Sequence, residues 1–267
     1  RLSTLVTGMH LSPEFGLTWR DIEADGFEIN ERVEILMSSD SGVGIAKAMG
    51  LGVIGFAEAL ERISADVLVI LGDRFEAFAA AQAARTIGLP VAHLHGGEIT
   101  EGAYDDAFRH AITKLSDYHF TATEAYQQRV LQLGEAPERV HMVGAFGLDH
   151  IVRKPVMPFA EMAATLPAPL SKPYALATYH PVTQGDEPSA ASADAMMTAL
   201  MMKPDLQVLA TFPNADSGGR EIIEVLERWQ SKVPERVILV PNLGFRRYLS
   251  AVQNAALVIG NSSSGLI

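Results

Sequence analysis

The chain has 267 residues, of which 48% are hydrophobic and 20% charged, so it is long and apolar enough to fill two cores. Its formal net charge of −11, without any run of Lys or Arg that would form a basic stripe, argues against a nucleic acid as partner. The sequence contains no cysteine, which excludes disulfides, thiolate zinc sites and cysteine nucleophiles.

The ends of the chain show no pattern of a targeting or membrane segment. The N-terminus opens as a strand-like run from Leu2 to Val6, and no uncharged apolar stretch reaches the roughly 18 residues that a membrane helix needs. We therefore expect a cytoplasmic protein without a membrane partner. No capped element precedes the opening strand, and the chain stops where a strand has just turned into a helix, so we expect it to be truncated at both ends.

Short apolar runs alternate with amphipathic stretches from the start of the chain. Strands are predicted near residues 2–7, 33–37, 66–71, 90–94, 118–122 and 140–143. Helical spacing of apolar residues, three or four apart, covers residues 75–87 and 106–115. This alternation is typical of an α/β fold with a parallel sheet, and it predicts a Rossmann-like N-terminal domain over residues 1–153.

Prolines then recur, at positions 155, 158, 167, 169 and 173, and make continuous helix or sheet improbable. We interpret residues 154–172 as a connection between two domains. The alternation restarts beyond it, with strands near 174–178, 206–212, 236–240 and 256–260, and helices near 189–202, 217–232 and 245–254. Residues 173–267 therefore form a second Rossmann-like parallel-sheet domain in this interpretation.

Polar segments directly follow the predicted strands of both domains. They are Gly72-Asp73-Arg74, the run 93–98, Thr178-Tyr179-His180-Pro181, and the runs 213–218 and 260–265. In open parallel sheets, ligands bind beyond the carboxyl ends of the strands. We expect these segments to line one cleft between the two domains.

Two of these segments have the chemistry to bind phosphate. The run 260–265 opens a helix with serine and glycine, so its free backbone amides and positive dipole end could hold an anion. A serine N-cap without a ligand explains the same pattern. Arg74 could neutralise a diphosphate, or it could lie in solvent at a helix start.

Carboxylates cluster on the strand-to-helix loops of the first domain, at Asp73, Glu98, Asp105 and Asp106. Paired acids can divide into acid and base when their environments separate their pKa values. The alternative for Asp105 and Asp106 is an N-cap with a dipole-favoured acid in the first turn. Arg109 follows on the same predicted helix, at a spacing that also suits an ion pair.

Position and neighbouring residues suggest different roles for the histidines. His93, His95 and Glu98 could mimic a metal site, but no further ligand has typical spacing, so no metal is expected. His180, at a strand end before proline, is the histidine most like a catalytic or phosphate-contacting group. We expect packed or surface positions for His110, His119, His141 and His150.

Two common nucleotide-binding motifs are not supported. The run from Gly42 to Lys47 resembles a dinucleotide-binding turn after a strand, but Lys47 occupies the third small-residue position, where a helix packs closely on a strand. No Gly-x-x-x-x-Gly-Lys-Ser/Thr sequence occurs either, which argues against a P-loop nucleotide hydrolase.

Several segments, taken together and in chain order, resemble the UDP-N-acetylglucosamine 2-epimerase family. They are Gly72-Asp73-Arg74-Phe75-Glu76, His95-Gly96-Gly97-Glu98, the run 105–114, Thr178-Tyr179-His180-Pro181, Phe212-Pro213-Asn214 and Gly260-Asn261-Ser262-Ser263. The match spans nearly the whole chain and looks specifically like the hydrolysing branch, of the sialic-acid-type pathway. The resemblance implies a glycosyltransferase-B-like pair of domains with UDP mainly on the second, further residues at both ends, and a homodimer or homotetramer.

The resemblance also implies a reaction. Elimination of UDP from UDP-N-acetylglucosamine gives 2-acetamidoglucal, and addition of water then gives N-acetylmannosamine, with no metal or redox cofactor. Carried over by motif, the catalytic residues are Asp73, Glu98, Asp105, Asp106, Arg109 and His180. The residues carried over as substrate contacts are His10, Arg74, His95, Asn214, Ser262 and Ser263.

The sequence leaves three alternatives open. The same chemistry on UDP-N,N'-diacetylbacillosamine differs only in a substituent at the fourth carbon of the sugar. A glycosyltransferase of similar architecture is the second, although clustered acids suit proton transfer better than sugar donation. The third is a UDP-sugar sensor without catalysis.

Overall fold

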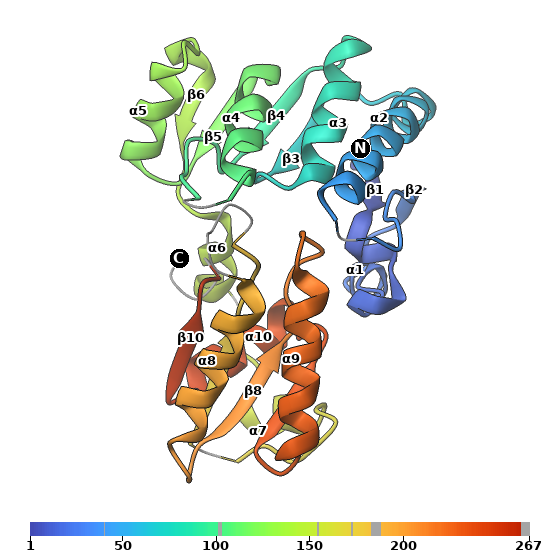
Figure 1. The fold of residues 1–267 in the computed structure, drawn as a ribbon. Coiled ribbons are helices and arrows are strands. Elements are labelled where there is room, and N and C mark those ends of the chain that lie inside the picture. Colours follow the sequence, from blue (N-terminus) through green and yellow to red (C-terminus); the bar gives the residue numbers. More distant parts are fainter. Residues whose placement is uncertain (40, 101–102, 154, 172, 183–187, 263–267) are drawn as a thin grey trace. The chain divides into compact units, whose positions relative to one another are not determined.

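The structure is a computed structural model of residues 1–267 and describes residues 1–39, 41–100, 103–153, 155–171, 173–182 and 188–262 (Figure 1). The chain forms two compact units. Unit 1 comprises Arg1–Leu11 and Trp19–Arg153, and unit 2 comprises Ser12–Thr18 and Lys154–Ile267. Both units are built on parallel strands, which confirms the predicted α/β class.

Unit 1 contains two parallel sheets. The larger sheet has the order β3-β4-β5-β6, with strands β3 (Leu68–Leu71), β4 (Val91–Leu94), β5 (Tyr118–Thr121) and β6 (Val140–Met142). Each strand lies beside the next one in sequence, so the connecting helices return the chain to the same end every time. A separate two-stranded sheet pairs β1 (Thr4–Thr7) with β2 (Ile29–Val33).

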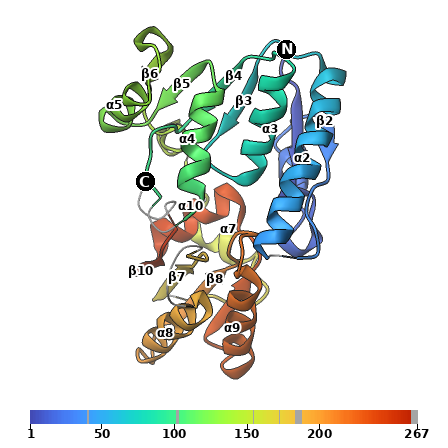
Figure 2. The ribbon, with the colours of Figure 1, turned by 45° about the horizontal axis from the view of Figure 1, so that its top comes forward.

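Helices pack beside these strands and build the core of unit 1 (Figures 1 and 2). The core includes residues of α2 (Gly42–Ile63), α3 (Phe75–Thr86) and α4 (Asp105–Leu115), while α5 (Glu124–Gln132) contacts β5 and β6. The remaining helices of the unit are α1 (Trp19–Ala24) and α6 (Phe146–Arg153). The alanine-rich α3 packs between α2 and α4. Packing is close, because a Cβ at Gly52 of α2 would lie only 3.0 Å from the Cβ of Ala79. This core fixes the position of α4, which carries much of the site.

The region from β2 to α2 differs from what the sequence predicted. We expected a strand near 33–37, but β2 ends at Val33, where its partner strand β1 also ends, at Thr7. Ile35 is buried in the core without belonging to a strand. The glycines 42 and 44 form the first turn of α2, which Ser41 caps by accepting the Gly44 amide at 3.1 Å. The apolar residues predicted as a strand near 33–37 therefore reflect core packing beyond Val33, and the glycine-rich run from Gly42 to Lys47 begins a helix.

Within the described residues, α2 is the one helix with the length and composition of a membrane span. Its buried residues include Ala48, Phe56 and Leu60, which belong to the core of unit 1. Packing within the unit thus accounts for this buried face, whereas Val43, Leu51 and Ile54 of the same helix are exposed.

Unit 2 is a doubly wound sheet of order β10-β7-β8-β9, all parallel. Its strands are β7 (Tyr174–Thr178), β8 (Gln207–Thr211), β9 (Val237–Val240) and β10 (Leu257–Gly260). Its helices are α7 (Phe159–Ala163), α8 (Ser189–Met201), α9 (Gly219–Lys232) and α10 (Gly244–Asn254). The polar residues after β7, β8 and β10 leave the sheet at one edge, because parallel strands end on the same side.

Side-chain alternation along β7 divides the core of unit 2 into two layers. Ala175 and Ala177 face a layer formed mainly with α8 and α9, while Tyr174 and Leu176 face the opposite layer. The second layer includes Met162 and Leu170, from the proline-rich stretch expected to be a connection. The described residues 155–171 thus contribute to the packing of unit 2.

Candidate active site

Asp73 lies at the turn between β3 and α3. Gly72 makes this turn with a φ of +79°, a conformation that suits glycine. The Gly72 amide donates to the Leu94 carbonyl at 2.9 Å, and the Gly72 carbonyl accepts from His93 Nε2 at 2.7 Å. The Asp73 carboxylate is therefore presented from a backbone that is tied to the neighbouring strand.

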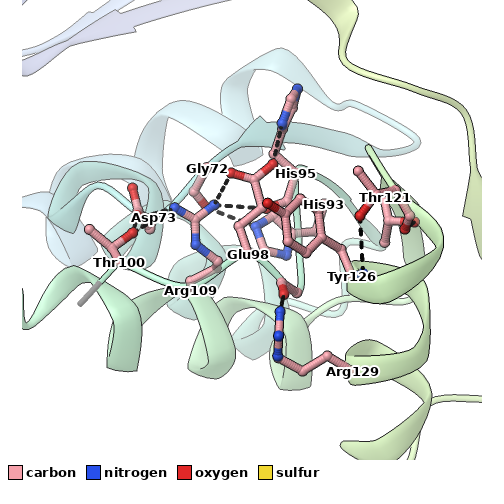
Figure 3. A network of polar contacts seen from close by, with 12 residues as sticks. Gly72, Asp73, His93, His95, Glu98, Thr100, Arg109, Thr121, Tyr126 and Arg129 are labelled. Atoms are coloured by element: carbon pink, nitrogen blue, oxygen red, sulfur yellow. Dashed lines mark hydrogen bonds and ion pairs between the residues drawn. The ribbon is translucent and has the colours of Figure 1, made fainter. Parts of the chain in front are cut away.

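Arg109 of α4 is the centre of a buried polar network, which also contains Asp73, His95, Glu98 and Thr100 (Figure 3). Its guanidinium donates to Asp73 Oδ2, to the His95 carbonyl at 2.8 Å and to Thr100 Oγ1 at 3.2 Å. It also lies 3.5 Å from Glu98 Oε2. Arg109 is only 6% exposed, so its charge acts at close range on both carboxylates. We call these five residues the Arg109 network.

Glu98 and His95 form a hydrogen-bonded pair, with 2.6 Å between His95 Nδ1 and Glu98 Oε1. A carboxylate facing Nδ1 favours the proton on that nitrogen, and the second ring nitrogen points away from the other labelled residues in Figure 3. The His95 backbone has a φ of +62°, which is uncommon outside glycine. Hydrogen bonds from its amide to the Phe120 carbonyl and from Arg109 to its own carbonyl hold this conformation.

His93 has a supporting position behind the network. It is fully buried, its Nε2 donates to the Gly72 carbonyl, and its Nδ1 lies 3.2 Å from Thr113 Oγ1 on α4. Burial lowers its pKa to about 4, against an opposing effect of the Gly72 hydrogen bond, so the ring is neutral at physiological pH. Both ring nitrogens are hydrogen-bonded, so His93 connects the end of β3 to α4.

No cluster of three metal-ligating side chains occurs among the described residues. Within that part of the chain, His95 and Glu98 are paired with each other, while His93 is held elsewhere.

Asp105 and Asp106 begin α4. The Oδ1 atom of Asp106 accepts the Thr100 amide at 2.9 Å, and its Oδ2 lies 3.6 Å from His110 Nε2. Asp106 thus holds the loop after β4 against the first turn of α4, which is a different contact from the N-cap considered above. Asp105 is buried, whereas Asp106 is partly exposed.

Arg74 and His10 belong to unit 1 but are not part of the Arg109 network. The Arg74 Nε is 3.6 Å from Glu76 Oε2, and its guanidinium reaches Met9 Sδ at 4.0 Å. Met9 and His10 belong to the short 3-10 helix Gly8–Leu11, and His10 is exposed. Arg74 therefore extends towards the segment that carries His10.

In unit 2, His180 is held at the end of β7 by two asparagines. The backbone amide of Asn214 donates to His180 Nδ1 at 3.1 Å. The side chain of Asn261 accepts the His180 amide at 2.7 Å and donates to the His180 carbonyl at 2.9 Å. Just inside the sheet, the hydroxyls of Thr178 and Thr211 are 2.6 Å apart and buried. Three strand ends therefore meet around His180, and we call His180, Asn214 and Asn261 the His180 group.

The predicted phosphate-binding serines follow β10. Ser262 comes directly after Asn261 and is partly buried. Ser263 and the remainder of the predicted turn lie outside the described residues. Because Gly260 pairs with Thr178, the chain leaves β10 beside the end of β7 that carries His180.

Comparison with known proteins decides the family. The family model for UDP-N-acetylglucosamine 2-epimerase matches residues 1–267. The chain belongs to the UDP-N-acetylglucosamine 2-epimerase family. This confirms the resemblance on which the residue roles were carried over.

Relatives and a solved structure agree with this epimerase family. The chain is 37% identical to the GDP/UDP-N,N'-diacetylbacillosamine 2-epimerase (hydrolyzing) of Campylobacter jejuni, over 99% of the chain and 69% of that protein. It is 38% identical to the UDP-N,N'-diacetylbacillosamine 2-epimerase (hydrolyzing) of Legionella pneumophila, over 100% of the chain and 70% of that protein. The UDP-GlcNAc 2-epimerase of Neisseria meningitidis, solved with UDP-GlcNAc, shares the fold with a TM-score of 0.71 at 15% identity, over 97% of the chain and 77% of that structure.

Several residues that support the candidate site had no predicted role. Thr100 and Asn261 each make a hydrogen bond to a candidate residue, and Thr113 makes one to His93 behind the Arg109 network; none of the three had been assigned a role. Asn261 had a usable signal, because it directly follows a strand. Thr113 had none, because it lies far from His93 in sequence.

Proposed function

We propose that this protein is a hydrolysing 2-epimerase of a UDP-linked 2-acetamido sugar. The observation that carries the proposal is the Arg109 network, in which two carboxylates contact one buried guanidinium at the end of a parallel sheet and a histidine ring pairs with one of them. Such an arrangement suits proton transfer at carbon, because it offers acids and bases whose positions are fixed. The family match and the hydrolysing relatives support the same chemistry.

The proposed reaction has two balanced steps. In the first, a base removes the proton from the second carbon of the sugar, the C–H electron pair becomes a double bond to the first carbon, and the bond to UDP breaks with its pair. In the second, water adds its hydroxyl to the first carbon while the second carbon takes a proton on the opposite face. The products are the 2-epimerised free sugar and UDP.

Unit 1 supplies the proton transfers in this proposal. Asp73 and the Glu98–His95 pair are the candidates for base and acid, and Arg109 balances the two carboxylate charges. Asp106 is a third candidate, on the first turn of α4, with Asp105 beside it. Each of these acid or base candidates can transfer a proton only if it lies within hydrogen-bond distance of the sugar.

Unit 2 supplies the contacts to the departing nucleotide. His180, Asn214 and Ser262 follow strands of a parallel sheet, where phosphates commonly bind, and we assign Ser263 to the same task. Arg74 and His10 are the corresponding candidates in unit 1. Contacts that strengthen as charge develops on the leaving diphosphate accelerate the elimination.

The choice of sugar rests on the relatives. Both hydrolysing relatives named above act, by name, on nucleotide-linked N,N'-diacetylbacillosamine, with GDP or UDP in one name and UDP in the other, while the family description names UDP-N-acetylglucosamine. We therefore propose UDP-N,N'-diacetylbacillosamine as the first substrate to test and UDP-N-acetylglucosamine as the second.

We further propose that the protein is cytoplasmic and forms a homodimer or homotetramer. Light scattering of the purified protein tests the oligomeric state.

The decisive assay incubates the full-length protein with each UDP-sugar and identifies the products by NMR. The expected result is free UDP together with the 2-epimerised sugar, which is N-acetylmannosamine from UDP-N-acetylglucosamine. Transfer of the sugar to an acceptor with its second carbon unchanged would support a glycosyltransferase instead. Binding of the UDP-sugar without release of UDP would support a sensor.

A further inference from the structure

The side chain of Asn261 holds the backbone of His180 on both sides. Its Oδ1 accepts the His180 amide at 2.7 Å, and its Nδ2 donates to the His180 carbonyl at 2.9 Å. These residues are far apart in sequence and come from the ends of two neighbouring strands, β10 and β7. A two-point contact of this kind fixes the direction in which the strand end leaves the sheet, and with it the direction of the His180 side chain.

The approach of Asn261 to His180 depends on Gly260. This residue has a φ of +139°, and a Cβ built on it would lie 1.7 Å from the Thr178 carbonyl oxygen. No other amino acid fits that space, because real Cβ atoms do not come so close to backbone oxygen. The end of β10 is thus built to bring Asn261 against the end of β7.

The contact with Asn214 determines where His180 carries its proton. The donor is the backbone amide of Asn214, at 3.1 Å from His180 Nδ1. An amide N–H cannot accept a hydrogen bond, so Nδ1 must present its lone pair. A neutral ring in this position therefore carries its proton on Nε2, and protonation of Nδ1 would replace a hydrogen bond with two opposed N–H groups.

We propose that Asn261 is a positioning residue that, together with the Asn214 amide, holds His180 as a neutral imidazole with Nε2–H as its donor. The inference rests on the proposed function for its consequence, which is that His180 gives a hydrogen bond to the departing diphosphate and does not act as a base. A neutral imidazole that donates to a developing negative charge is a known catalytic device.

The tautomer is directly observable by NMR. Full-length protein labelled with ¹⁵N-histidine, without nucleotide and near neutral pH, gives long-range ¹H–¹⁵N correlations whose pattern separates the two neutral tautomers from the imidazolium. The His180 signals are assigned by their loss in His180→Gln. We expect the Nε2–H pattern. A proton on Nδ1, or a charged ring, would overturn the proposal.

Variants of Asn261 test the positioning. Asn261→Ala removes both contacts, so we expect exchange between tautomers and a loss of roughly tenfold in kcat/KM, as the net value of such hydrogen bonds suggests. Asn261→Asp keeps the acceptor and loses the donor, and should fall between Asn261→Ala and the parent. The matched control is Asn254→Ala, which removes another side-chain contact to a backbone carbonyl, at the opposite end of β10.

The control should leave both the His180 spectrum and the activity unchanged. An Asn261→Ala protein that keeps the parent His180 spectrum would contradict the positioning role. The spectrum is recorded without turnover, so it tests the positioning role separately from the proposed function. If only the proposed function fails, the parent protein shows the Nε2–H pattern and yet releases no UDP.

Discussion

At the residue scale, Arg109 is the group on which the candidate site of unit 1 depends. Its charge lies between Asp73 and Glu98, and its hydrogen bonds also hold the left-handed backbone of His95. We predict that Arg109→Ala lowers the free energy of unfolding by about 3 to 5 kcal/mol, because it leaves the buried Glu98 and the largely buried Asp73 without their counter-charge. Urea unfolding monitored by circular dichroism measures this change.

The matched control for Arg109 is Arg62→Ala. Arg62 also pairs with a carboxylate, Glu31, but that ion pair is exposed and should contribute little. Equal losses of stability in the two variants would show that Arg109 does not hold buried charge.

A second residue-scale prediction concerns His93 and pH. Burial lowers the pKa of this ring to about 4 from the ordinary 6.5, so the neutral form stabilises the folded state. That contribution is complete above about pH 6.5 and is lost as the pH falls towards 4, with a total of about 3 kcal/mol. His93→Gln should remove this part of the pH dependence, as measured by unfolding from pH 7 to about pH 4. Parallel stability curves for the two proteins would contradict the assignment.

Asp106 has two possible roles, which two substitutions separate. Asp106→Asn keeps the oxygen that accepts the Thr100 amide but cannot act as a base, whereas Asp106→Ala loses both functions. If Asp106 is the base, both variants lose about 3 to 5 kcal/mol of transition-state stabilisation and keep UDP affinity. If it only holds the loop, Asp106→Asn turns over almost normally while Asp106→Ala does not. Steady-state kinetics and calorimetry with UDP distinguish the two.

At the scale of elements, the sequence predicted the sheet strands well because buried parallel strands are short, continuous apolar runs. The observed bounds of β7 match the predicted ones, and β3, β4 and β8 lie within the predicted ranges. The same signal failed for β2, because the apolar residues beyond Val33 enter the core without a partner strand. Helix α2 was missed because Gly42 and Gly44 suggested a turn, whereas they begin the helix, and its later Gly52 packs closely on Ala79 of α3.

The positions of the candidate site residues were predictable from the sequence, but the contacts between them were not. Strand ends are visible in sequence, so Asp73, Glu98 and His180 could be chosen from position and chemistry alone. The contacts among them could not, because they join segments far apart in the chain, as Arg109 joins Asp73 across an intervening strand and helix. Motif resemblance supplied residue roles but no geometry.

Glycine substitutions give an element-scale prediction. Gly260→Ala should destabilise the protein by more than about 3 kcal/mol, since the new Cβ would collide with the Thr178 carbonyl and separate β10 from β7. Gly26→Ala has a positive φ but open space, so its cost should be about 1 kcal/mol. Gly50→Ala, in the helix α2 with nothing within 4 Å, should stabilise by about 0.5 to 1 kcal/mol. Denaturant unfolding ranks the three, and any other order contradicts the structure of β10.

At the scale of the whole molecule, the proposal divides the work between the two units. Asp73→Asn in unit 1 should abolish turnover and leave UDP affinity within about twofold, because it changes proton transfer and no nucleotide contact. His180→Ala in unit 2 should weaken both, with UDP affinity reduced roughly tenfold by the loss of a hydrogen bond to a charged group. Calorimetric titration with UDP measures the affinities. An Asp73→Asn protein that no longer binds UDP would contradict this division.

In the proposed reaction, the second carbon of the sugar loses its proton and regains one from water. Turnover of the two candidate UDP-sugars by the full-length protein in deuterated water tests it most directly. We expect free UDP and a 2-epimerised sugar in which deuterium fully occupies the second carbon, since hydration of the glucal takes that atom from solvent. Release of UDP with the original hydrogen still on the second carbon would contradict it, because simple hydrolysis would then explain the reaction.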